Sequence, residues 1–244
     1  MSATEIVITA AGCVTGWGCG SHRSAPRSWD DLPGGSGAGP RPPAFAWSSL
    51  FAAPCPRFGR MDPLCRLGLA SVELMGIDFA ALAPDERAVT AVCLGTPEGS
   101  LSVDVDFWRG RDGAGGPNPT LFTYTLPSTL LGEICIRHGL KGPNLCLMLD
   151  AAGSGRLLQG AAEWLRRGAA AACACVLANA VEGAAASRAE PTSTGPGRSF
   201  ACALFLERRD DAARRNRPAL RPLPAGAAGI RDLCESLCGV PPRA

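Results

Sequence analysis

Runs of apolar residues alternate along this chain with segments that have the apolar spacing of helices. Five runs rich in β-branched and small apolar residues predict buried strands: residues 5–14, 88–94, 144–149, 171–178 and 200–206. The helix-like segments lie between the strands: residues 61–76, 101–108, 124–139 and 152–167. Because each strand is apolar throughout, we expect an α/β fold in which helices cover both faces of the sheet.

Residues with special backbone roles indicate where these elements start and stop. Asp62 is placed to cap the first helix, with Pro63 in its first turn and Gly76 just beyond its end. Residues 20–56 are dense in serine, glycine and proline, and this composition predicts a long loop.

The length of 244 residues suits one large domain, to which we assign residues 1–225. Residues 226–244 form a C-terminal tail with one short amphipathic stretch, residues 230–238. Hydrophobic residues make up 46% of the chain and charged residues 19%, which excludes an intrinsically disordered protein. The net charge of +2 is scattered, so no nucleic-acid partner is expected.

The twelve cysteines raise the question of compartment and metal binding. No apolar run reaches the roughly 18–20 residues of a membrane span, and the first residues lack a cationic, signal-like pattern. We therefore expect a cytoplasmic protein whose thiols are reduced, most of them as small buried apolar side chains. Cys173 and Cys175 alternate within a strand, Cys234 and Cys238 stand apart, and no CxxC pair exists. This spacing predicts neither a metal site nor a cofactor.

Several local motifs, in this order, resemble the N-terminal half of the β-ketoacyl synthases, which have the thiolase-like fold. The resemblance extends over residues 5–222 and no single motif would suffice for it. The motifs are IVITAAGCVTG at 6–16, GRMD at 59–62, LGTPEG at 94–99, NPTLF at 118–122, LKGPN at 140–144 and ACALFLE at 201–207. The resemblance implies half of a thiolase-like fold, with a mixed five-stranded sheet flanked by helices.

The position that the resemblance assigns to the family's cysteine nucleophile holds Ala151 in this chain. Alanine cannot be acylated, and the neighbouring Asp150 places a carboxylate where a thiolate or an oxyanion would have to form. The family's two catalytic histidines lie in a second half that we expect to be absent, because the sequence stops at Ala244. His22 and His138 do not match their positions. The resemblance therefore implies a subunit with no catalytic residues of its own.

The sequence leaves three interpretations of residues 150–155 open. In the first, which the pattern favours, Asp150 is a helix N-cap followed by small residues that allow close packing. A phosphate cradle is the second, although Asp150 would repel the anion. The third is a nucleophilic Ser154, which has no nearby histidine or lysine in the sequence. Cys146 is similarly either a core thiol, pointing inward together with Met148, or a displaced nucleophile.

Two further groups of side chains have a structural and a functional interpretation. Phe122, Tyr124, Leu126 and Leu130 lie on the segment that borders the acyl pocket and the subunit interface in the family, so they either fill the core or shape an acyl tunnel. The mixed-charge residues 208–217 form either a solvated face or a docking patch for an acidic acyl carrier protein.

Half of this fold would leave an apolar face uncovered, which implies a partner. The resemblance then points to a chain length factor, an inactive synthase-like subunit that forms a heterodimer with a full-length ketosynthase and shapes the acyl tunnel. Its pathway would be type II fatty acid or polyketide biosynthesis of the aryl polyene type, with an acyl carrier protein as second partner. The alternative is a diverged acyltransferase or thioesterase that acts on acyl-carrier thioesters through Cys146 or Ser154.

Overall fold

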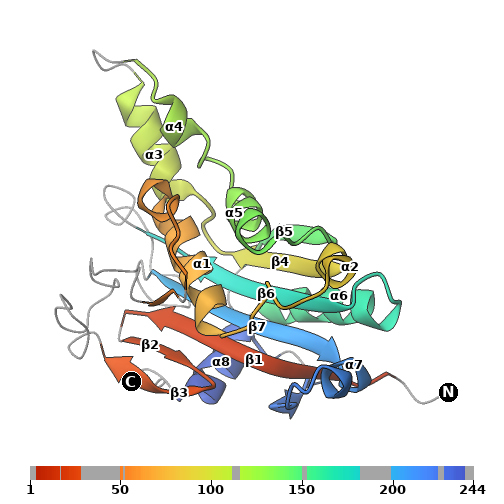
Figure 1. Ribbon diagram of the computed structural model, residues 1–244. Coiled ribbons are helices and arrows are strands. Elements are labelled where there is room, and N and C mark those ends of the chain that lie inside the picture. Colours follow the sequence, from red (N-terminus) through yellow and green to blue (C-terminus); the bar gives the residue numbers. More distant parts are fainter. Residues whose placement is uncertain are drawn as a thin grey trace.

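The computed structural model describes residues 4–16, 18–28, 50–51, 53–111, 116–149, 153–181, 199–224 and 228–239. The strands in this part of the chain form a single eight-stranded sheet (Figure 1). They are β1 (Ile6–Thr15), β2 (Gly18–Ser21), β3 (Ser24–Ser28), β4 (Thr90–Thr96), β5 (Asn144–Met148), β6 (Ala172–Asn179), β7 (Phe200–Arg208) and β8 (Arg221–Pro222). The α/β class with a mixed sheet is confirmed, but the expected number of five strands is wrong.

The order of the strands across the sheet is β3-β2-β1-β7-β6-β4-β5, and β8 pairs with β1. Strands β6, β4 and β5 are parallel, whereas β7 runs antiparallel to both β6 and β1. The carboxyl ends of β6, β4 and β5 therefore meet at one edge of the sheet. Ligands of open α/β sheets bind outside such an edge.

Helices cover both faces of the centre of this sheet (Figure 1). Helices α1 and α5 contribute to one core layer, and α6 and α8 contribute to the other. The helices are α1 (Pro63–Leu74), α2 (Pro84–Ala88), α3 (Leu101–Gly110), α4 (Pro119–Phe122), α5 (Thr129–His138), α6 (Ser154–Arg166), α7 (Arg209–Arg214) and α8 (Ile230–Cys238). None of the helices among the described residues is long and apolar enough to cross a bilayer.

The first helix begins as its sequence predicts. The Asp62 carboxylate accepts hydrogen bonds from the backbone N–H groups of Leu64 (3.2 Å) and Cys65 (3.0 Å), and Pro63 occupies the first turn. Gly76 follows the helix with a φ of +65°, a conformation that favours glycine. These local signals suffice because caps act within a single turn of the chain.

The amino-terminal part of the expected loop at residues 20–56 is instead a β-hairpin of β2 and β3, which extends the sheet beyond β1. The close approach of the strands explains its composition, since a Cβ on Gly18 would lie 2.2 Å from the backbone oxygen of Arg27. Residues 29–49 lie outside the described residues.

The amphipathic stretch near the end of the chain is helix α8, and it packs onto the sheet. Its residues Ile230, Leu233, Cys234 and Cys238 are buried in the same layer as α6. All twelve cysteines are free thiols, and nine of them are buried, as the sequence predicted.

Candidate functional site

The carboxyl ends of β4 and β5 are tied together where the resemblance places the nucleophile position. Leu149 N–H donates to the carbonyl of Thr96 (3.0 Å), and the buried Thr96 hydroxyl accepts from Gly99 N–H (3.1 Å). Asp150 and Ala151, on which the predicted loss of the nucleophile rests, lie outside the described residues.

The start of α6 corrects one interpretation and disfavours another. The N-cap of α6 is Gly153, not Asp150, and it makes no side-chain capping hydrogen bond. Ser154 is fully buried, and its hydroxyl accepts a hydrogen bond from Ile230 N–H (3.0 Å), which ties α6 to α8. A hydroxyl that holds two helices together inside the core is not presented to a substrate, so a nucleophilic Ser154 is disfavoured.

Two buried acceptors near the same edge have no hydrogen-bond partner in the described part of the chain. They are Oε2 of Glu98, just after β4, and Oδ1 of Asn179, at the end of β6. Leaving a buried acceptor unsatisfied costs about 1–3 kcal/mol, so a donor supplied from outside would be stabilised here. The sequence analysis did not identify either residue, because a single polar side chain after an apolar run is common at strand ends.

The four residues assigned to an acyl pocket or interface fall into two pairs. Leu130 is fully buried against α1, where a Cβ on Gly68 would lie 2.3 Å from its Cδ2, and Tyr124 is 8% exposed. Phe122 and Leu126 are 60% and 64% exposed, so ordinary core packing does not describe them. The assignment of the four residues to an acyl pocket stays a prediction.

Of these four residues, only Tyr124 lines the cavity of about 250 Å³ between the start of α1 and the α3–α4 region. The rest of its wall is contributed by Arg60, Met61, Asp62, Pro63, Arg66, Ser102, Val103, Asp106, Asn118, Thr120 and Leu121. The structure thus joins Tyr124 to residues that the sequence analysis did not connect with it.

Tyr124 is fixed by a buried carboxylate on α5. Its hydroxyl donates to Oε1 of Glu133 (3.2 Å), and Arg57 donates to the same oxygen (2.8 Å). Burial and the adjacent Glu133 raise the pKa of Tyr124, while the hydrogen bond to Glu133 raises the pKa of Arg57. Tyr124 therefore keeps its proton and connects the segment after α4 to α5.

Four large apolar side chains, each at least 60% exposed, lie on α3, α4, the segment before α5 and β5. We call them the arm-and-edge patch: Trp108, Phe122, Leu126 and Met148. Figure 1 shows α3 and α4 extending away from the body of the sheet as an arm. The rings of Phe107 and Phe122 lie 5.4 Å apart and connect α3 to α4. The exposure of Met148 corrects the expectation that it points inward with Cys146.

Strand β5 is the outer strand on this side, and in the described part of the chain no strand pairs with its free edge. Val92 N–H donates to the carbonyl of Pro143 and Leu149 N–H to that of Thr96, both at 3.0 Å. Because bonding alternates along a parallel ladder, the backbone groups of Cys146 face away from β4. The expectation that both faces of each strand are covered does not hold for β5, whose residues are half-buried or exposed.

The remaining candidates for catalysis are poorly suited to it. Cys146 is half-buried, and burial raises the pKa of its thiol, which keeps it protonated. His138 packs against Phe79 with ring centroids 4.5 Å apart, and burial lowers its pKa to about 4. His22 lies at the β2–β3 turn, where burial lowers its pKa as well.

Every arginine of residues 208–217 has an acidic partner within the chain. The pairs are Arg208 and Arg214 with Asp211, Arg209 with Glu5, and Arg215 and Arg217 with Glu207. The side chains of Arg215 and Arg217 are only 17% and 16% exposed, and that of Glu207 is fully buried. A solvated face is therefore wrong for these two arginines, and their neutralisation within the chain disfavours a docking patch at this segment.

No known family profile matches the sequence, and neither does any curated protein. Solved structures do match. The ishigamide ketosynthase/chain length factor has 23% identity and a TM-score of 0.66 over 90% of this chain. The ketosynthase ApeO in complex with its chain length factor ApeC, from Xenorhabdus doucetiae, has 15% identity and a TM-score of 0.59 over 84% of this chain and 79% of the matched chain.

A third match is a type II polyketide synthase acyl carrier protein in complex with its ketosynthase, AntDE:AntF, with 16% identity and a TM-score of 0.63. It covers 88% of this chain and 65% of the matched one. This chain likewise spans 65% of the length of the ishigamide protein that it matches. At these identities the likeness concerns the fold: the chain has the fold of the ketosynthase and chain length factor structures.

Proposed function

We propose that this protein is a chain length factor-type subunit that pairs with a full-length ketosynthase and helps to shape the acyl tunnel. The pathway is type II polyketide or fatty acid biosynthesis of the aryl polyene type, in which an acyl carrier protein delivers the growing chain. The likeness to structures described as ketosynthase and chain length factor complexes supports this proposal.

The observation that carries the proposal is the free edge of β5 next to the arm-and-edge patch. An uncovered parallel edge strand exposes backbone donors and acceptors that are ready to pair with another chain. The arm-and-edge patch exposes Met148 on β5 itself, Leu126 before α5, and Phe122 and Trp108 on the arm, and burial of these side chains would stabilise a complex. A partner that adds a strand to β5 and covers Leu126 and Phe122 satisfies both surfaces at once.

The position of Tyr124 supports a role in shaping the tunnel. Tyr124 lines the cavity beside α4. Phe122, two residues before it, and Leu126, two residues after it, are exposed. The same short segment thus touches the interior through Tyr124 and the proposed partner through its neighbours. Bulky side chains at such a junction would limit the length of an acyl chain that enters from the partner.

The alternative of an acyltransferase or thioesterase has less support from the described residues. Ser154 is buried and bonded, and burial raises the pKa of Cys146. In addition, the resemblance places Ala151 where the nucleophile would stand. We therefore infer that the chain has no acyl-transfer activity of its own.

Co-expression with a full-length ketosynthase of the same source tests the pairing. We expect the two proteins to elute together on size-exclusion chromatography. Separate elution, together with a ketosynthase that is fully active alone, would contradict the proposal.

Intact-mass analysis after incubation with acyl carrier thioesters tests whether this chain has acyl-transfer activity. We expect no acyl adduct on this chain, and a stable adduct would favour the acyltransferase.

A further inference from the structure

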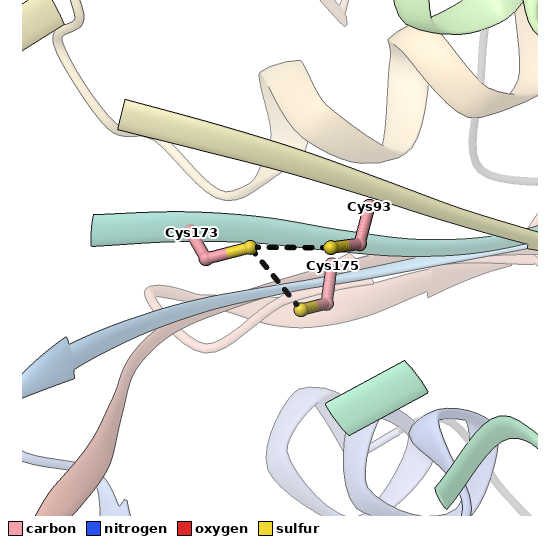
Figure 2. Close-up of side chains that lie close together, drawn as sticks. All are labelled: Cys93, Cys173 and Cys175. Atoms are coloured by element: carbon pink, nitrogen blue, oxygen red, sulfur yellow. Dashed lines mark hydrogen bonds between the residues drawn. The ribbon is translucent and has the colours of Figure 1, made fainter. Parts of the chain in front are cut away.

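Three cysteine thiols meet in the core layer between the sheet and helices α6 and α8. Cys93 lies on β4, and Cys173 and Cys175 lie on β6 (Figure 2). The sulfur of Cys173 is 3.6 Å from that of Cys93 and 3.7 Å from that of Cys175, and all three lie within 4.8 Å of one another. We call this group the cysteine triad. Linear spacing did not reveal it, because Cys93 comes from a distant part of the sequence.

The surroundings of the cysteine triad are fully buried and apolar. Each of the three residues has an exposed fraction of 0%. Cys93 and Cys175 lie opposite each other on β4 and β6. The other residues opposite the three cysteines on neighbouring strands are all apolar: Ala91, Leu145, Leu204 and Leu206. A ligand at the triad is therefore separated from water and has no charged register partner to balance it.

These surroundings restrict which ions the triad can hold. Three thiols and no oxygen or imidazole ligand select a soft, thiophilic ion. Zinc prefers four ligands, and three thiolates around Zn²⁺ carry a net charge of −1. Three thiolates around Cu⁺ carry −2. Burying such unpaired charge in an apolar layer is strongly unfavourable, whereas a trivalent ion with three thiolates is neutral.

We propose that the cysteine triad is a binding site for a trivalent thiophilic metalloid, of which arsenic(III) is the probe. Arsenous acid, As(OH)₃, exchanges its three hydroxyl groups for the three sulfurs. Three As–O bonds break and three As–S bonds form, each thiol proton leaves on a hydroxide as water, and no atom is oxidised or reduced. The sulfurs of such a pyramidal centre lie near van der Waals contact, as the thiols of the triad do.

The bound arsenic would covalently connect the neighbouring strands β4 and β6, one strand in from the β5 edge. Because the three thiols are arranged in advance only in the folded chain, the triad binds arsenite more tightly than the scattered thiols of the unfolded chain, and the thermal midpoint rises with arsenite concentration. The ion reaches the triad through local opening of the helical layer, so binding is slow compared with diffusion.

The experiment adds sodium arsenite to the purified full-length chain under reducing conditions without competing dithiols. We expect one arsenic per chain by native mass spectrometry, three sulfur neighbours by X-ray absorption spectroscopy, and a raised thermal midpoint. Two or fewer sulfur neighbours, no binding, or a lowered thermal midpoint would overturn the proposal. These measurements use the unmodified chain and do not depend on any variant.

Variants locate the ion. Cys93→Ala and Cys175→Ala should each weaken arsenite binding by more than about 100-fold. Removal of a residue that only orients a ligand typically costs about 10–100-fold, and these two cysteines are ligands themselves. Cys65→Ala is the matched control, since Cys65 is a buried thiol on the opposite face of the sheet, and it should bind as the unmodified chain does. Cys234→Ala tests the other thiols of the same layer. Loss of binding in Cys234→Ala and not in the triad variants would place the ion elsewhere and overturn the proposal.

Discussion

Strands β3 and β5, at the two ends of the strand order, differ in how readily their free edges can pair with another chain. Strand β3 has the sequence SAPRS, and its Pro26 lacks an N–H group while its Arg27 is charged and exposed. Strand β5 has the sequence NLCLM, with neither proline nor charge. Proline and charge on an edge strand prevent pairing with another chain. The contrast indicates that β3 is protected as an outer edge, whereas β5 retains the features of a strand that another chain completes.

Cys146→Pro should have the largest effect on this contrast. The backbone N–H of Cys146 faces away from β4, so proline removes a donor that only a partner could use. We expect affinity for the ketosynthase to fall at least about 100-fold, equivalent to about 3 kcal/mol, with little change in the thermal midpoint. Isothermal titration calorimetry and thermal unfolding measure the two quantities.

The control for Cys146→Pro lies at the opposite edge. Arg27→Ala on β3 changes an exposed side chain and should leave the affinity for the ketosynthase unchanged. If Arg27→Ala weakened the complex and Cys146→Pro did not, the roles assigned to the two edges would be reversed.

The second prediction concerns pH and compares two histidines: His138 on α5, which packs against Phe79, and His22 at the turn between β2 and β3. Burial, and to a smaller extent the charge of Arg137, lower the pKa of His138 on α5 to about 4, from about 6.5 in the unfolded chain. The unfolded chain therefore binds a proton that the folded chain does not. The free energy of unfolding is therefore at its full value above about pH 6.5. It decreases as the pH falls toward 4, by about 3 kcal/mol in all.

The measurement compares urea unfolding of the unmodified chain and His138→Gln between pH 7.5 and 4.5. We expect the variant to lose most of the extra pH dependence, because glutamine does not titrate. His22→Gln at the β2–β3 turn is the matched control, and it should remove a smaller share, since His22 is less buried. An equal or larger share for His22 would show that acid acts first on the β3 side.

Tyr124→Phe tests the fixed segment beside the β5 edge. It removes the hydroxyl that donates to Glu133 but keeps the ring that lines the cavity. Hydrogen bonds to charged groups contribute about 2 kcal/mol, so the free energy of unfolding should fall by about that amount. An unchanged free energy of unfolding would mean that Glu133 is satisfied by Arg57 alone.

Leu126→Lys should have the smallest effect. Burial of this side chain by a partner contributes about 1–2 kcal/mol, so a charge there should weaken the complex about tenfold without unfolding the chain. Ile136→Lys is a matched control, because Ile136 is 63% exposed but lies outside the arm-and-edge patch. Equal weakening by both variants would remove the special role of the patch.

Much of the fold could be predicted from the sequence where a signal is local. Asp62 and Pro63 begin α1 as expected, and the amphipathic residues 230–238 form α8. The hairpin of β2 and β3 could not be predicted, because residues rich in glycine and serine become strands only through pairing with β1.

The candidate site was less predictable because its features depend on residues far apart in the sequence. The charge pattern of residues 208–217 resembles a solvated face, and only the fold brings Arg215 and Arg217 to the buried Glu207. In the same way, the exposure of Phe122 depends on α4 extending away from the sheet in the arm, not on the residue's spacing in the sequence.

Hydrogen–deuterium exchange on this chain, alone and with its ketosynthase, tests the central claim most directly. If the partner completes the sheet at β5, the amides of Cys146 and Met148 should exchange at least about tenfold more slowly in the complex, while those of β3 stay unchanged. A complex that forms while the amides of β5 exchange as fast as before, or that protects β3 instead, would contradict the account.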